Sequence, residues 1–326
     1  MSPSQATGIE GEITVQVNLS AGDAAYAAAT VPALVQAHPQ AVARLAVVDL
    51  CRPQRTRIFD PAKRLPEPGF STRAAAIWEM AMEWQRAGLF DTVVKLEPGS
   101  PLIPELARRY TRPWMTETHD YGGCAGTAYW AALALPATRF VAHYDADMLL
   151  YQAPGFDWAE EAVRHWSSFP GTTIAATPRP SPPGFAASPG QDGAVRQEGR
   201  PTERIPLGWL NDWFSTRCFL VDRERLAPNL PLIHSRDAWR WRLRRLVDRG
   251  YPPSPEVVLC RSLGRQGWRR LALADERAWL LHPHSKPPGY LALLPKIQAA
   301  VAAGLAPDGQ KGFAEIQLAA WQAFFR

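Results

Sequence analysis

Two aspartates one residue apart, Asp145 and Asp147, have the spacing in this sequence that most clearly indicates chemistry. They follow residues 140–144, an apolar run with the pattern of a buried strand. Carboxylate oxygens are ligands that Mg²⁺ and Mn²⁺ prefer, so two of them at a strand end could share one cation. Such a cation neutralises negative charge on a diphosphate. The alternative is a solvated turn after a strand.

The segments around this pair alternate between strand-like and helix-like patterns. Strands are predicted over 13–19, 43–50, 90–97 and 139–145, and helices over 20–38, 71–88, 101–110 and 126–135. This alternation is typical of an α/β domain with a mostly parallel sheet flanked by helices. Ligands of such sheets bind at the carboxyl ends of the strands, where Asp49 also lies.

Beyond residue 150 the pattern is less regular. Residues 178–208 contain seven prolines and five glycines, and we expect a long flexible loop there. Strands are predicted over 172–177 and 213–226, and a further helix runs from Pro255 to Gly267. The segment 236–250 is predicted to be an amphipathic helix. Its inward face is expected to hold four residues, Trp239, Leu243, Leu246 and Val247.

The composition is that of an ordinary globular protein. The chain has 326 residues, 46% of them hydrophobic, and a net charge of +5. The small basic excess suits an acidic ligand, nucleic acid or an anionic membrane and selects none of them. Its four cysteines form no CxxC pair, which argues against a zinc site or disulfide framework. The sequence shows no signal peptide and no apolar run of about 20 residues, so we expect a cytoplasmic protein.

The sequence resembles the GT-A fold of nucleotide-sugar glycosyltransferases, closest in style to family 2. The resemblance rests on 14–28 (TVQVNLSAGDAAYAA), the strand ending at Asp49, 126–147 (GTAYWAALALPATRFVAHYDAD) and 255–268 (PEVVLCRSLGRQGW), and it covers roughly residues 12–285. It implies a single GT-A domain, residues 1–326. Residues 10–150 would bind the nucleotide sugar, residues 151–290 would form the acceptor and catalytic half, and residues 291–326 would form a helical tail.

The resemblance also implies roles for the donor-side residues. Asp49 would contact the nucleotide base, and Asn18 would assist in binding the donor nucleotide. Asp145 would face the nucleoside, with Asp147 toward a Mn²⁺ or Mg²⁺ ion that both can ligate. The segment 51–57 (CRPQRTR) departs from the polar cluster usual after the second strand. For Asp49 the alternative is a turn aspartate at a strand end.

Glu256 matches the acidic residue that begins a helix in this family and acts as general base. The pattern is matched by Leu259, Leu263 and Gly267, while the arginine is shifted to Arg261. A glutamate within hydrogen-bond reach of an acceptor hydroxyl can remove its proton. The alternative is electrostatic, because the helix dipole favours a carboxylate in the first turn. Asp212 is the second candidate for the base.

The family pattern also assigns roles in the C-terminal half. His284, or alternatively His282, would complete the metal site, and Lys286 would contact the diphosphate. Trp209 and Trp213 would stack on an acceptor sugar, although core packing explains tryptophans equally well.

The resulting hypothesis is a metal-dependent glycosyltransferase, a hexosyl- or related transferase. It would move a sugar from a nucleotide-diphosphate sugar to an acceptor hydroxyl, carbohydrate or other, with inversion. A nucleotidyltransferase is an alternative, but residues 18–27 have one glycine and no basic residue where such enzymes carry a basic glycine-rich loop. A catalytically degenerate GT-A domain that binds a partner is another. We expect no nucleic-acid partner.

Two segments raise the hypothesis of peripheral contact with the inner face of a membrane. The arginine-rich helix 236–249 and the tail 313–326 could each lie on an anionic bilayer. The commoner alternative is that such helices pack on their own domain or on a second subunit.

Overall fold

A nine-stranded sheet forms the centre of the protein in the computed structural model, which describes residues 13–184, 201–233, 235–246, 253–283 and 285–326. The strand order is β3-β2-β1-β4-β9-β6-β10-β8-β7. The strands are β1 (Ile13–Ser20), β2 (Ala43–Asp49), β3 (Thr92–Leu96), β4 (Phe140–Asp145), β6 (Thr173–Thr177), β7 (Pro201–Ile205), β8 (Gly208–Asn211), β9 (Cys218–Asp222) and β10 (Arg269–Leu273).

Most of these strands run in one direction. β3, β2, β1 and β4 are parallel neighbours, as are β6 and β10, while β9 and β8 run antiparallel to the strands beside them. The prediction of a mostly parallel α/β sheet flanked by helices is therefore confirmed. The four strands predicted before residue 150 are all present, with ends shifted by no more than a few residues.

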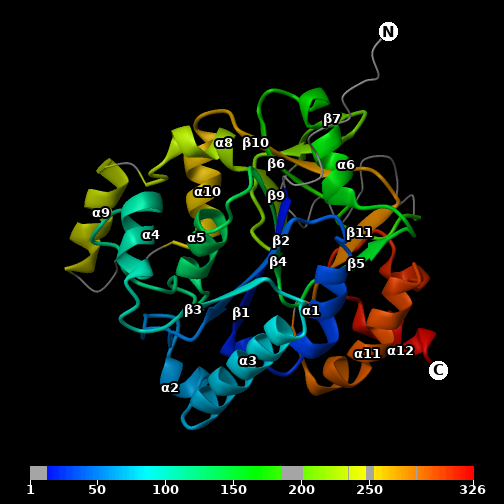
Figure 1. The fold of residues 1–326 in the computed structure, drawn as a ribbon, viewed down its shortest axis with the longest axis horizontal. Coiled ribbons are helices and arrows are strands. Elements are labelled where there is room, and N and C mark those ends of the chain that lie inside the picture. The colour runs from blue at the N-terminus through cyan, green and yellow to red at the C-terminus, as the bar shows by residue number, and fades with distance from the viewer. Residues whose placement is uncertain (1–12, 185–200, 234, 247–252, 284) are drawn as a thin grey trace.

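Helices cover both faces of the sheet (Figure 1). α4 (Leu102–Tyr110), α5 (Gly126–Ala134), α9 (Ser235–Arg245) and α10 (Pro255–Gly264) gather on one side. α1 (Ala27–Gln36), α6 (Trp158–Arg164), α11 (Pro288–Ala302) and α12 (Leu318–Phe324) lie on the other. The remaining helical segments are η1 (Ala21–Asp23), α2 (Pro61–Arg64), α3 (Gly69–Arg86), η2 (Trp166–Ser168), α8 (Arg223–Leu226), η3 (Ala227–Asn229) and η4 (Asp308–Gln310).

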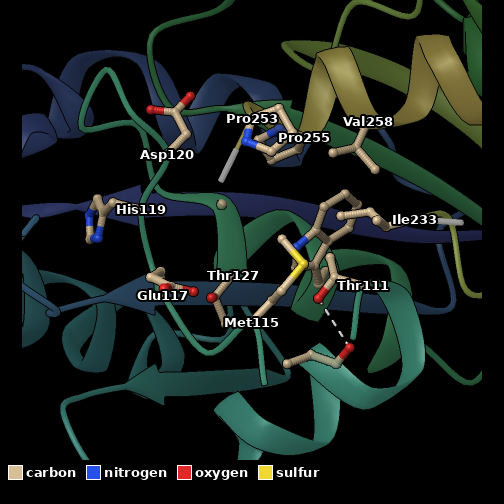
Figure 2. A pocket seen from close by; sticks show the side chains of 13 residues that line it. Thr111, Met115, Glu117, His119, Asp120, Thr127, Ile233, Pro253, Pro255 and Val258 are labelled. Carbon is tan, nitrogen blue, oxygen red and sulfur yellow. Dashed lines mark hydrogen bonds between the residues drawn. The ribbon is translucent and has the colours of Figure 1, made fainter. Parts of the chain in front are cut away.

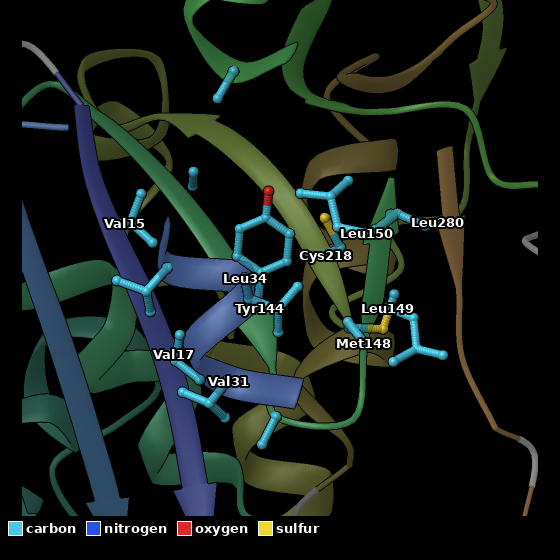
Figure 3. Packing of buried hydrophobic residues seen from close by; sticks show 14 of the residues in the cluster. Val15, Val17, Val31, Leu34, Tyr144, Met148, Leu149, Leu150, Cys218 and Leu280 are labelled. Carbon is cyan, nitrogen blue, oxygen red and sulfur yellow. The ribbon is translucent and has the colours of Figure 1, made fainter. Parts of the chain in front are cut away.

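The two faces of the sheet form two hydrophobic cores because side chains alternate along each strand. Ala46 and Val48 of β2 point into the core beneath α1, whereas Leu45 and Val47 point into the core beneath α4 and α5. Figure 3 shows the first core, where Val31 and Leu34 of α1 pack beside Tyr144 of β4. Burial on both faces explains why these strands are apolar along most of their length.

Register brings the polar strand ends to one edge. Asn18 of β1 lies opposite Asp145 of β4, and Ser20 lies opposite Asp49 of β2. Parallel pairing of these neighbours therefore aligns the side chains predicted to bind the donor.

A second, two-stranded sheet was not predicted from the sequence. β5 (Leu149–Gln152) pairs antiparallel with β11 (Ala278–Leu281), and Leu149 lies opposite Leu281. The residues just before β5 and just after β11 are therefore neighbours. This pairing places the segment that begins at His282 beside Asp147.

Two predictions for the second half were wrong. The segment predicted to be a loop up to residue 208 contains the hairpin strand β7 and the start of β8, because these residues extend the sheet beyond β10. Residues 185–200 lie outside the described part of the chain.

The predicted inward face of α9 was also wrong. Trp239 and Leu243 are 60% and 59% exposed, and Leu246 just after the helix is 81% exposed. Ala238 and Trp241 make the contact with the core instead, because they lie on the face turned toward the sheet. Val247 is outside the described residues.

Candidate active site

Asp145 ends β4 and is held by a tyrosine. The Tyr129 hydroxyl of α5 donates to both carboxylate oxygens, at 2.7 and 2.8 Å. Burial, and then the charge of Asp145, raise the pKa of Tyr129 far above its usual value, so the hydroxyl stays a donor. His143 Nε2 lies 3.4 Å from the same carboxylate, whose side chain is 24% exposed.

Asp147 is paired with Lys286. The Lys286 ammonium lies 2.6 Å from Asp147 Oδ2, and both side chains are partly exposed. The same ammonium lies 4.9 Å from the ring centroid of Tyr26. The sequence analysis placed Asp147 and Lys286 in one site. They are far apart in the chain, and the β5–β11 pairing brings them together.

Asp23 is a third carboxylate at this edge, and the sequence analysis did not identify it as a site residue. It accepts hydrogen bonds from the Ser20 backbone N–H at 2.6 Å, from the Ser20 hydroxyl at 2.9 Å and from the Tyr26 hydroxyl. Removal from water raises the pKa of Asp23 to about 6, and the negative charge of Asp147 adds to this effect. Its position three residues after the first strand was the available signal.

The carboxylates fit a divalent cation in their chemistry, although the described residues do not complete a metal site. Asp145 and Asp147 offer hard oxygen donors, and the Lys286 ammonium at Asp147 demonstrates that this position attracts positive charge. Across the described ranges, no three His, Cys, Asp or Glu side chains converge as a metal site would require. The predicted ligand His284 lies outside those ranges.

His282 does not suit the alternative role as a metal ligand. The side chain is 4% exposed, and its Nε2 accepts from the guanidinium of Arg217. A ring nitrogen engaged in this way has no lone pair for a cation.

Asp49 and Asn18 present buried polar atoms without partners. Asp49 Oδ1 accepts from the Cys51 backbone N–H at 2.8 Å, whereas Oδ2 has no hydrogen bond. Asn18 Oδ1 accepts from Gln16, whereas its Nδ2 has no partner. Buried polar groups are rarely left unsatisfied, so these two atoms are candidates for ligand contacts.

The Asp49 carboxyl is buried beside a neutral histidine. Burial raises the pKa of this carboxyl to about 7. His119 Nε2 is 3.9 Å from Asp49 Oδ2, but burial lowers the pKa of His119 to about 4, so its ring is neutral near pH 7. Asp49 is therefore poised to accept a hydrogen bond from a neutral donor.

A small pocket extends from His119 toward the start of α10 (Figure 2). His119, Asp120 and Glu117 lie on one side of it, and Pro255 and Val258 of α10 lie across from them. The pocket therefore connects the surroundings of Asp49 with the helix that begins with Pro255 and Glu256.

Glu256 lies in the first turn of α10 and is oriented by a tryptophan. The Trp213 indole N–H donates to Glu256 Oε1 at 2.9 Å. Desolvation raises the pKa of the Cys124 thiol to about 11, and the charges of Asp145 and Glu256 both add to this rise. The predicted base and the predicted donor carboxylate therefore both affect the electrostatics of this thiol.

Trp209 and Asp212 are the two remaining predicted residues. Trp209 is 6% exposed, with the guanidinium carbons of Arg179 and Arg204 lying 5.5 and 5.0 Å from its ring centroid. The buried ring offers no open face for a sugar, which corrects the stacking prediction for Trp209. Asp212 lies on the surface, where its carboxylate is 3.5 Å from the Arg269 guanidinium.

The similarity of this chain to known proteins is found among solved structures. No protein-family model and no curated protein matches the sequence. The chain is similar to the galactosyltransferase LgtC in complex with donor and acceptor sugar analogs, with 11% identity over 91% of this chain and 98% of that chain and a TM-score of 0.39.

Two further structures are similar to this chain. An active-site mutant of LgtC is 11% identical over 76% of this chain and 68% of that chain, with a TM-score of 0.32. A mycobacterial protein is 13% identical over 89% of this chain and 73% of that chain, with a TM-score of 0.33. At these values no residue role is transferred from those proteins to this chain.

Proposed function

We propose that this chain is a glycosyltransferase that moves a sugar from a nucleotide-diphosphate sugar to an acceptor hydroxyl. The observation that carries the proposal is the alignment of four polar side chains along one sheet edge. Asn18 and Asp49 contribute buried atoms without partners, and Asp145 and Asp147 contribute partly exposed carboxylates. A donor with a nucleoside at one end and a diphosphate at the other matches this order of groups.

The nucleoside is proposed to bind at Asp49 and Asn18. Asp49 Oδ2 would accept from a base N–H or a ribose hydroxyl, and Asn18 Nδ2 would donate to a base carbonyl. These contacts would favour donor binding, because each one satisfies an atom that is otherwise buried without a hydrogen bond. Substitution of either residue should weaken donor binding more than it changes turnover.

The diphosphate is proposed to lie at Asp147, Asp145 and Lys286. Asp145 and Asp147 would hold Mg²⁺ or Mn²⁺, with His284 as a further ligand. The cation would supply charge neutralisation for the diphosphate leaving group. Lys286 would add its positive charge to the phosphate oxygens from the position it occupies beside Asp147.

Glu256 is proposed as the base that takes the proton from the acceptor hydroxyl. The Trp213 N–H donates to Glu256 Oε1 and so orients the carboxylate that would take the proton. Trp213 is 38% exposed, so its ring could also contact an acceptor sugar. Attack by the hydroxyl on the anomeric carbon, opposite the leaving diphosphate, would invert that carbon.

The test is a panel of uridine and guanosine diphosphate sugars, screened by thermal shift with and without Mn²⁺. We expect one donor to raise Tm, and the rise to be reduced in Asp49→Asn. Release of nucleoside diphosphate, by hydrolysis or transfer, would then establish turnover. Stabilisation without any release would indicate a binding protein, and no stabilisation by any member of the panel would contradict the proposal.

A further inference from the structure

An apolar stripe on α9 faces away from the rest of the molecule. Trp239 is 60% exposed, Leu243 59% and Leu246 81%. The three residues are spaced three or four apart, so they share one face of the helix and of the turn that follows it. Figure 1 shows α9 at the periphery of the molecule, next to α4.

The opposite face of α9 is the one that packs. Ala238 is 3% exposed and Trp241 packs against the core beneath α4 and α5. Asp237 is tied to Arg265 through an ion pair of 2.9 Å. The helix is thus anchored in its orientation, and the exposure of its stripe follows from how it is attached.

Arginines border the stripe. Arg236 and Arg240 lie along one side of it and Arg242 along the other, and all three are exposed. The guanidinium carbon of Arg242 lies 5.5 Å from the centroid of the Trp239 ring. An apolar stripe between cationic side chains matches the cross-section of an anionic bilayer surface, where headgroups lie above acyl chains.

We propose that the α9 stripe, defined as Trp239, Leu243 and Leu246 with the bordering arginines, docks this protein on an anionic lipid bilayer. The helix would lie in the plane of the interface with the leucines toward the acyl chains. Trp239 suits the boundary because its indole is apolar with one polar N–H. No helix in the described ranges is long and apolar enough to cross a membrane.

The chemistry of the stripe favours a bilayer over nucleic acid. Phosphate backbones would engage the arginines, but they offer no apolar layer to cover two leucines and a tryptophan. The C-terminal tail exposes less apolar surface, since Phe313 and Phe324 are 40% and 44% exposed. Trp321 of α12 is 0% exposed, so its aromatic side chain belongs to the core.

The test is sedimentation of the full chain with vesicles. The vesicles contain either phosphatidylcholine alone or phosphatidylcholine mixed with phosphatidylglycerol, at low ionic strength. We expect binding to the anionic vesicles, weakened by added salt because surface charges are screened. Failure to sediment with anionic vesicles at low salt would overturn the proposal.

Two variants test the two parts of the stripe. Leu243→Ser should weaken binding about ten-fold or more, because the variant loses the transfer free energy of a leucine that is buried among the acyl chains. Arg240→Ser should weaken it about five-fold, which is the contribution of one arginine near an anionic surface. Leu243 and Arg240 are both exposed, so the fold should tolerate either substitution.

The matched controls are Leu305→Ser and Arg86→Ser, at exposed sites outside α9. They should bind vesicles like the unchanged chain. Equal weakening by the controls would mean nonspecific attraction by overall charge and would contradict the proposal. Loss with Arg240→Ser but not with Leu243→Ser, together with competition by duplex DNA, would instead identify a nucleic-acid surface.

Discussion

Asp147 and Asp145 differ in their partners although only one residue separates them. The Tyr129 hydroxyl fixes Asp145 through two hydrogen bonds. Asp147 instead pairs with Lys286, whose long side chain has more rotatable bonds. A fixed carboxylate keeps one geometry, while the other can exchange its ammonium for a stronger cation. The two carboxylates therefore differ in how firmly their partners hold them.

Asp147→Asn should lower kcat/KM for sugar transfer at least about 100-fold, because it removes the charge that would hold the cation. Tm should change by no more than a few degrees, since the side chain lies at a strand end. Steady-state assays across Mn²⁺ concentrations provide the measurement, with Asp308→Asn as the control because Asp308 is also paired with a lysine. Unchanged activity in Asp147→Asn would eliminate the metal assignment.

Asp49→Asn should stabilise the protein at pH 8 and leave its stability unchanged near pH 3. The pKa of Asp49 is about 7 in the folded protein against an ordinary value of 3.8, so the folded state binds the proton more tightly. Stability therefore falls as pH rises from about 4 through 7, because the buried carboxyl must ionise. Asparagine does not ionise and avoids this loss, which we expect to be about 1–3 kcal/mol.

Urea unfolding of both proteins at several pH values measures that difference. Asp91→Asn, at an exposed aspartate, serves as the control. A stability gain that is the same at all pH values would argue against the buried carboxylate as its cause. Asp49→Asn should also bind the donor more weakly. The aspartate would then lower stability above its pKa while it strengthens donor binding.

At the scale of elements, α10 owes its role to the loop between β8 and β9, which carries Trp213 to its first turn. Ser254 caps the helix by accepting from the Val257 backbone N–H, and Glu256 follows as the first acidic residue. The indole N–H then selects one orientation of that carboxylate. A helix start and a loop far apart in sequence thus form one unit.

Trp213→Phe keeps an aromatic face but removes the N–H donor. If Trp213 positions Glu256, kcat should fall about 10-fold with little change in KM for the acceptor. Glu256→Gln should abolish most turnover while donor binding by calorimetry stays intact. A raised acceptor KM with normal kcat in Trp213→Phe would show that sugar contact, and not orientation of the base, is the role of this residue.

At the scale of the whole molecule, the C-terminal segment is part of the core that supports the site. Trp321 is 0% exposed, and its indole N–H donates to Gln310 Oε1 at 2.9 Å. Tyr290 of α11 joins the same core, and burial, with an addition from the charge of Asp147, raises its pKa above the usual value of a tyrosine. The last helices therefore belong to the core that supports the sheet edge with Asp147.

Trp321→Ala should cost about 3–5 kcal/mol of unfolding free energy, because a large buried side chain leaves a cavity. Phe324→Ala in the same helix should cost less than about 1 kcal/mol, since Phe324 is 44% exposed. Urea denaturation of both variants provides the comparison. Similar losses from the two substitutions would mean that α12 is attached less specifically than its burial indicates.

The sequence allowed prediction of the strands and of the edge where the site lies. Apolar periodicity marks β1, β2 and β4, and strand direction then brings Asp49 and Asp145 to one edge. The β5–β11 pairing could not be predicted, because register between segments so far apart leaves no local signal. Periodicity also identified α9 as amphipathic without fixing which tryptophan, Trp239 or Trp241, faces the core.

The pairing of β5 with β11 has a consequence for synthesis of the chain. Asp147 leaves the ribosome long before Lys286, its partner in the folded protein. During that interval the nascent chain carries the Asp147 carboxylate without the lysine that pairs with it. The ion pair at Asp147 can therefore form only when translation has passed residue 286, late in the production of each molecule.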